Sequence, residues 1–248
     1  MLAMRRKDTG GFVSAGSIVI ASRFNGPPDS ANGGYACGLI AVATDASVGV
    51  RLHRPPPLEG PLLVEPTGPG RWQVRDQAEV VATAVETDVR LELPEPPDYL
   101  QALDLSKHYV GFEAHSFPTC FVCGPERRAG DGLRIFAGAL ASGSGVAAPW
   151  LPHPSLGDAA GKVRPEFVWA ALDCPGYFAL SAGNRPAVLG ELAVHIDRLP
   201  PVEKPCVVMG WLMESSGRKY RAGTALYDED GGALARGIAT WIEIATPS

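Results

Sequence analysis

The sequence predicts an α+β protein built from two similar halves, each an antiparallel sheet wrapped around one buried helix. Three observations support this prediction: an internal repeat, two nearly all-apolar helix patterns, and several strand patterns separated by turn residues. The chain has 248 residues, which is enough for one large domain or two small ones, each with its own hydrophobic core.

The internal repeat is the clearest of these signals. Residues 50–64 align with residues 194–208 at an offset of 144 without a gap, and seven of the fifteen positions are identical. In the first copy the shared positions are Val50, Arg54, Pro56, Pro57, Glu59, Pro61 and Val64. Apolar residues alternate on both sides of each proline cluster, and proline cannot donate to a sheet ladder. Each copy therefore predicts two short strands joined by a proline loop.

Upstream of each copy, the sequence is typical of the start of an apolar helix. In the first half, NGGY at residues 32–35 precedes ACGLIAVAT. In the second half, RPEF at residues 164–167 precedes VWAALDCPGYFAL. A helix that is apolar on every side is buried on every side. Because strand patterns follow in both halves, we predict a double hotdog, the architecture in which a sheet wraps around a central helix.

The two repeats also predict the domain organisation. We assign residues 1–93 to the first hotdog repeat, 94–131 to a linker, and 132–248 to the second repeat. The linker opens with PEPP and contains LQALDLSKHYV, a pattern that favours a short helix.

Composition and charge exclude several classes of protein. The chain is 46% hydrophobic and 20% charged, which argues against long disordered stretches. The net charge is −5 and the only basic run is at residues 5–7, so we expect no nucleic-acid partner. No apolar run reaches the roughly 18 residues that span a membrane, and the first residues lack the apolar segment of a secretory signal. We expect a cytoplasmic protein, monomeric or paired as a homodimer.

Two motifs resemble a known superfamily. The segment CFVCGP at residues 120–125, continuing to GDGLRI at 130–135, resembles the opening of hotdog thioesterase-superfamily domains. The second half is similar to the phenylacetyl-CoA thioesterase-like branch, where a helix-start motif precedes a helical Asp by nine residues, as Arg164 precedes Asp173 here. The residues RLP at 198–200 lie where the following strand should end in that branch. The resemblance covers nearly the whole chain as two copies, and it implies hydrolysis of an acyl-CoA or acyl-carrier thioester without a cofactor.

The sequence departs from this family in a complementary way. The family's helix start is His-Gly-Gly; here the first half has Asn32 in place of His, and the second half has no glycine at residues 164–166. The helical acid is present in the second half as Asp173. The matching first-half position is Ala41, with Asp45 one helical turn later.

These losses predict one composite site. In two-chain relatives the resemblance implies that one subunit supplies backbone donors and the other the carboxylate. Asn32, Gly33 and Gly34 of the first half are therefore predicted to face Asp173 of the second half. The mirror-image site, at residues 165–166 and Ala41, is predicted to be inactive.

The residue types suit thioester chemistry. Backbone N–H groups at a helix N-terminus stabilise the oxyanion that forms during hydrolysis, and glycine lets the thioester carbonyl approach them closely. Asp173 is expected to act as a general base or as a nucleophile. Because its neighbours in the sequence are apolar, we expect burial to raise its pKa.

The same residues also have structural interpretations. Asp173 would then cap a turn or bind Arg198 or Trp169, the glycines would serve close packing, and Asn32 would be an N-cap residue. These interpretations leave a non-catalytic acyl-CoA-binding or regulatory hotdog protein as the alternative function. A hydratase ranks lowest, because it should show an Asp-x-x-x-x-His arrangement that the sequence lacks.

The cysteines predict neither disulfides nor a metal. Five cysteines form an odd and sparse set, so we expect reduced thiols. Cys120 and Cys123 form a single CxxC, and a structural zinc site needs four ligands, so His108, His115 or a second CxxC would have to complete it. There is no second CxxC, and we expect no metal. Nucleotide-binding glycine motifs and a GxSxG elbow are also absent from the sequence, so no organic cofactor and no serine hydrolase are expected.

Overall fold

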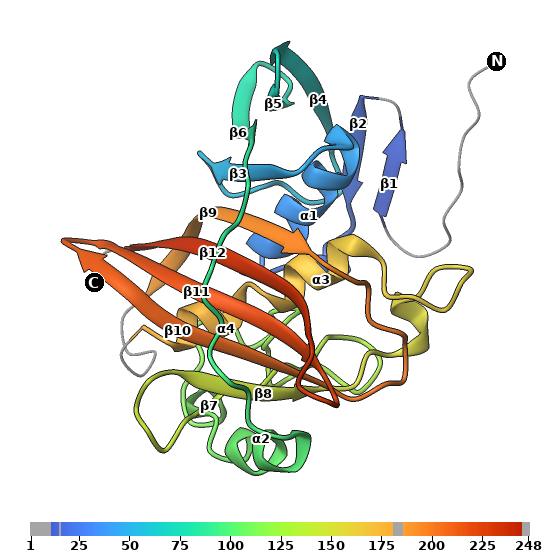
Figure 1. The fold of residues 1–248 in the computed structure, drawn as a ribbon. Helices are drawn as coiled ribbons and strands as arrows, with labels where there is room; N and C mark the ends of the chain where they lie inside the picture. Colours follow the sequence, from blue (N-terminus) through green and yellow to red (C-terminus); the bar gives the residue numbers. More distant parts are fainter. Residues whose placement is uncertain (1–10, 15, 181–185, 245–248) are drawn as a thin grey trace.

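The computed structural model describes residues 11–14, 16–180 and 186–244, and the basic run at residues 5–7 lies outside them. The described chain forms one twelve-stranded antiparallel sheet that curves around the helices (Figure 1). The first half contributes β1 (Gly11–Ser14), β2 (Ser17–Ile20), β3 (Val48–Leu52), β4 (Pro61–Gly68), β5 (Arg71–Asp76) and β6 (Glu79–Glu86). The second half contributes β7 (Gly138–Ala139), β8 (Val146–Trp150), β9 (Ala187–Ile196), β10 (Cys206–Ser216), β11 (Lys219–Asp228) and β12 (Ala233–Glu243).

The strand order is pseudo-symmetric about its centre. It runs β1-β2-β4-β5-β6-β3-β9-β12-β11-β10-β8-β7, so each half has the same order when read outward from the β3–β9 junction. At this junction Gly49 pairs with Ala193, and Arg51 forms an ion pair with Glu191 at 2.9 Å. The two sheets therefore join edge to edge, and the predicted double hotdog is confirmed.

The two proline loops make the same backbone contacts. The Pro56 carbonyl accepts from the amide of Ala31 at 2.9 Å, and the Pro200 carbonyl accepts from the amide of Val163 at 2.9 Å. The aligned residues Glu59 and Glu203 have left-handed φ angles of 63° and 58°, which few non-glycine residues adopt. The repeat read from the sequence is thus also a repeat in three dimensions.

The two central helices differ. In the first half, α1 (Gly33–Thr44) is continuous and buried from Gly34 to Ala41, while Val42 in its last turn is exposed. In the second half the prediction of a single helix is wrong, because the segment forms two short helices, α3 (Pro165–Ala171) and α4 (Cys174–Phe178). Pro175 has no N–H for a bond to Ala171, and its ring would clash with that carbonyl, so the helix breaks before it. No helix in the described part of the chain has both the length and the apolar character that a bilayer crossing requires.

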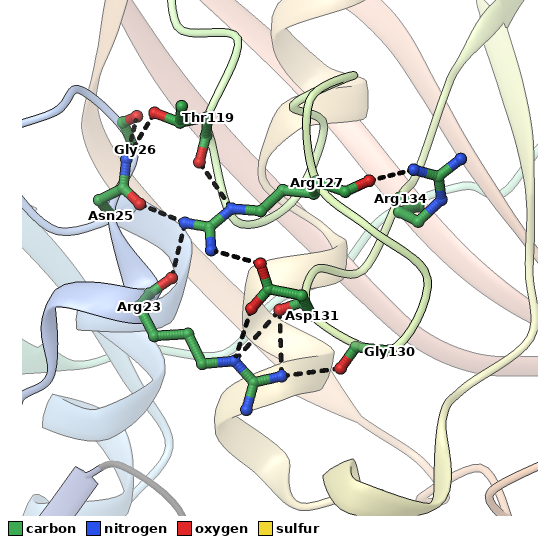
Figure 2. Close-up of polar contacts among 8 residues, drawn as sticks. All are labelled: Arg23, Asn25, Gly26, Thr119, Arg127, Gly130, Asp131 and Arg134. Carbon is green, nitrogen blue, oxygen red and sulfur yellow. Dashed lines mark hydrogen bonds and ion pairs between the residues drawn. The ribbon is translucent and has the colours of Figure 1, made fainter.

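The segment between the repeats is packed onto them. It contains α2 (Tyr99–Ser106), which confirms the expected short helix, and residues 120–123 are buried in the main core. Arg127 ties the segment to the first half: its guanidinium donates to the Arg23 carbonyl at 2.8 Å and pairs with Asp131 at 3.0 Å (Figure 2). This segment therefore contributes to the core, while the boundaries at residues 93 and 132 stay predictions.

Candidate active site

The candidate site forms where α1 crosses α3 and the start of α4. Glycine makes this close crossing possible. A Cβ atom on Gly34 would lie 2.5 Å from the Cβ of Asp173 and 2.9 Å from the Trp169 carbonyl oxygen. One turn later, a Cβ atom on Gly38 would lie 2.8 Å from the Cα of Glu166. The packing role considered for glycine is therefore present at Gly34, in addition to any chemical role.

The Asp173 carboxylate joins the two halves of the molecule. Its Oδ2 accepts a hydrogen bond from the Asn32 side-chain amide at 2.8 Å and another from the backbone amide of Gly34 at 3.0 Å. Asp173 is only 2% exposed, and within the described structure its Oδ1 has no hydrogen-bond partner. The structure thus brings together Asn32, Gly34 and Asp173, which the sequence grouped across 141 residues.

Burial dominates the electrostatics of this carboxylate. Removal from water raises the pKa of Asp173 to about 7, because the charged form loses its solvation. The hydrogen bonds from Gly34 and Asn32 act in the opposite direction and lower the pKa by less. The expected upward direction is therefore present in the structure.

Asn32 makes two contacts at once. Its Oδ1 accepts from the Tyr35 amide at 2.9 Å, which is the N-cap interaction of α1, while its Nδ2 donates to Asp173. The N-cap interpretation is therefore confirmed, whereas a catalytic role for Asn32 stays a prediction.

A cavity of about 290 Å³ lies beside these groups. Asn32, Gly33 and Asp173 border it, together with apolar side chains that include Leu52 and Leu189. The Gly33 amide is at the N-terminus of α1 and makes no hydrogen bond to any residue that the structure describes. The sequence analysis expected the thioester carbonyl to approach the amides of both glycines. Instead the Gly34 amide is in direct contact with the Asp173 carboxylate, and the cavity lies alongside.

The cavity also contains a residue that the sequence analysis missed. Trp241, in β12, borders it, and the buried indole Nε1 lacks a hydrogen-bond partner among the described residues. The strand pattern around Trp241 predicts only a core position, so nothing in the sequence indicated a place in the cavity wall.

The mirror-image position is arranged differently. Ala41 has no carboxylate, and the buried Glu166 lies 3.5 Å from the Arg164 guanidinium, which stacks over the Phe167 ring. Arg198 pairs with Asp228 at 2.8 Å, so the interpretation in which Asp173 binds Arg198 is wrong. The asymmetry between the two positions is therefore present in the structure, while its effect on activity stays a prediction.

Comparison with known proteins identifies the class of fold. No protein-family model and no curated protein matches the sequence. Among solved structures, a tesB protein of Mycobacterium avium subs paratuberculosis is similar, with 15% identity, a TM-score of 0.61, and coverage of 94% of this chain and 95% of that one.

Two further structures have the same fold. An acyl-CoA thioesterase II, TesB2, of Mycobacterium marinum has 12% identity, a TM-score of 0.57 and coverage of 95% of both chains. A conserved protein of unknown function with a hot dog fold from Alicyclobacillus acidocaldarius has 12% identity, a TM-score of 0.58, and coverage of 96% of this chain and 97% of that one. At these identities the likeness shows the fold: the chain is a double-hotdog protein.

Proposed function

We propose that the protein hydrolyses acyl thioesters at a single composite site between its two hotdog repeats. One observation carries the proposal. Oδ1 of Asp173 and the helix-terminal amide of Gly33 both lack a hydrogen-bond partner among the described residues, and both residues border the same cavity. Hydrolysis of a thioester needs an acceptor for a proton of water and a donor to the oxyanion. The two halves supply one group each.

The reaction would proceed through a tetrahedral intermediate. Asp173 accepts a proton from a water molecule whose oxygen adds to the thioester carbonyl, and the carbonyl π electrons move onto its oxygen. The Gly33 amide, at the positive end of the α1 dipole, donates to that oxyanion. When the carbonyl re-forms, the carbon–sulfur bond breaks, and the sulfur takes the proton from Asp173. The products are a carboxylic acid and a free thiol.

The cavity supports a preference among substrates. Its volume of about 290 Å³ is at the low end for a small-molecule site, and Leu52, Leu189 and Phe178 contribute apolar surface. A compact acyl group fits such a space, with the thiol portion, coenzyme A or an acyl carrier, extending out of it. The resemblance to thioester hydrolases and the likeness to the M. marinum acyl-CoA thioesterase support a coenzyme A thioester as the kind of substrate, without bearing on the size of the acyl group.

The direct test is a panel of acyl-CoA and acyl-carrier thioesters of increasing acyl size, assayed for release of free thiol. We expect turnover of compact acyl groups and its loss in Asp173→Asn. Tight binding by the native protein without turnover of any member would contradict the proposal and support the non-catalytic acyl-CoA-binding alternative.

A further inference from the structure

Three cysteines that are distant in sequence meet beside the cavity. Cys120 and Cys123 belong to the segment between the repeats, and Cys174 is the first residue of α4. Their sulfur atoms all lie within 4.8 Å of one another, and the Cys120 and Cys174 sulfurs are 3.9 Å apart. All three side chains are buried and none forms a disulfide.

The separation of the Cys120 and Cys174 sulfurs matches that of two ligands of one ion. A tetrahedral zinc ion binds thiolate sulfur at about 2.3 Å, which places two such sulfurs about 3.8 Å apart. A disulfide would require a sulfur–sulfur distance of about 2.05 Å. The observed 3.9 Å between Cys120 and Cys174 is therefore close to the spacing around a metal.

Polar neighbours contact the Cys120 sulfur. The Cys174 sulfur lies within hydrogen-bond distance of it, at 3.9 Å. The Asn32 side-chain amide is a further donor, 3.9 Å from the Cys120 sulfur. Such donors stabilise the negative charge that thiolate ligands keep around a divalent ion.

The turn that carries the CxxC pair is closely built. The Gly124 amide donates to the Cys120 carbonyl at 2.9 Å, and a Cβ atom on Gly124 would lie 2.5 Å from the Pro118 carbonyl oxygen. Glycine is thus required at the position that closes the turn. Nε2 of His115 lies 3.3 Å from the Cys123 sulfur, which places an imidazole ring beside the cluster.

We propose that Cys120, Cys123 and Cys174 bind a zinc-type divalent ion as thiolates, with His115 supporting the site through Cys123. Binding releases the remaining thiol protons to solvent. The ion would fasten the segment between the repeats to the start of α4, and so hold Asp173, the residue before Cys174. The proposal replaces the expectation of no metal, and it is independent of the proposed thioester hydrolysis.

The test measures metal content in the full, tag-free chain. We expect one zinc per chain after dialysis against zinc and then against metal-free buffer. Cys174→Ser should lower the zinc content at least about 10-fold, and His115→Ala should raise the dissociation constant about 10-fold or more. The matched control is Cys206→Ser, since Cys206 is also a buried free thiol but lies outside the cluster; it should retain the ion.

Cobalt substitution tests the native chain if the variants do not fold. Co²⁺ at this site should give the visible absorption of a tetrahedral ion together with thiolate-to-metal charge transfer, and a chelator should remove both and lower Tm. The proposal is overturned if Co²⁺ produces no thiolate charge transfer, if Cys174→Ser retains full zinc, or if the purified protein contains a Cys120–Cys174 disulfide.

Discussion

The two central helices occupy equivalent places in the two repeats but have different properties. The first, α1, is unbroken and begins with two glycines, so its N-terminal amides can be approached closely. The second begins with Pro165 and Glu166 and breaks at Asp173, which leaves a carboxylate at the break. In the proposed function, the first half supplies the donor amides and the second half supplies the acceptor carboxylate. Two copies within one chain could then each specialise, because only one site between them would have to remain complete.

Removing the acceptor should give the largest effect on this comparison. Asp173→Asn keeps the shape of the side chain and the oxygen that accepts from Asn32 and Gly34, but it removes the base. We expect kcat/KM for thioester hydrolysis to fall about 100-fold or more. Tm should fall little, because a buried charge is also removed. A variant that loses stability but retains its rate would mean that Asp173 is structural.

Closing the gap between the helices should have the next largest effect. Gly34→Ala places a methyl group against the Asp173 side chain and the Trp169 backbone, so we expect the free energy of unfolding to fall by about 2 kcal/mol. Gly33→Ala is the matched control. A Cβ atom at residue 33 would lie 2.8 Å from the end of the Leu189 side chain, which can move, rather than from backbone. Urea denaturation compares the two. Equal losses of stability would show that the crossing at Gly34 is not tight.

Substitutions can separate the contributions of the two hydrogen bonds that the Asn32 side chain makes. Asn32→Ser keeps an N-cap acceptor for α1 but is too short to reach Asp173, whereas Asn32→Ala loses both interactions. We expect Asn32→Ala to be less stable than Asn32→Ser by about 1 kcal/mol in urea denaturation. If the two variants unfold at the same urea concentration, the cap contributes nothing measurable.

The smallest effect on stability and turnover is expected for the acid in the first repeat. Asp45 is the first-half acid nearest to the position that matches Asp173, but it is an exposed C-cap residue of α1 with a φ of 52°. Asn tolerates this left-handed conformation well, so Asp45→Asn should change stability by less than about 0.5 kcal/mol and leave turnover unchanged. A marked loss of turnover would show that the first half carries a second functional acid.

The sequence predicted the sheet better than the site. The repeat at residues 50–64 and 194–208 was visible because proline loops and alternating strands leave a local pattern, and duplication accounts for the pseudo-symmetry of the strand order. The break at Asp173 was less visible, although Pro175 was a local signal, because apolar composition alone does not distinguish one helix from two.

The contacts across the site depend on tertiary packing. Gly34 and Asp173 were grouped correctly by complementarity, but the sequence had no measure of their separation. Cys174 was not grouped with Cys120 and Cys123, because only the fold brings residues more than fifty positions apart into one cluster. Short-range spacing rules for metal ligands do not detect such a set.

The β3–β9 junction makes the stability of each repeat depend on the other. Both strands are paired on two sides: β3 lies between β6 and β9, and β9 lies between β3 and β12. The buried residues Val50 and Leu192 are opposite each other in the β3–β9 ladder. If the backbone were cut between the halves, each fragment would present an unpaired strand edge, a surface prone to aggregation. Folding would then become bimolecular and concentration-dependent. Because the two repeats are covalently linked, each has the other at a fixed, high effective concentration. The two repeats can therefore diverge in sequence and still associate.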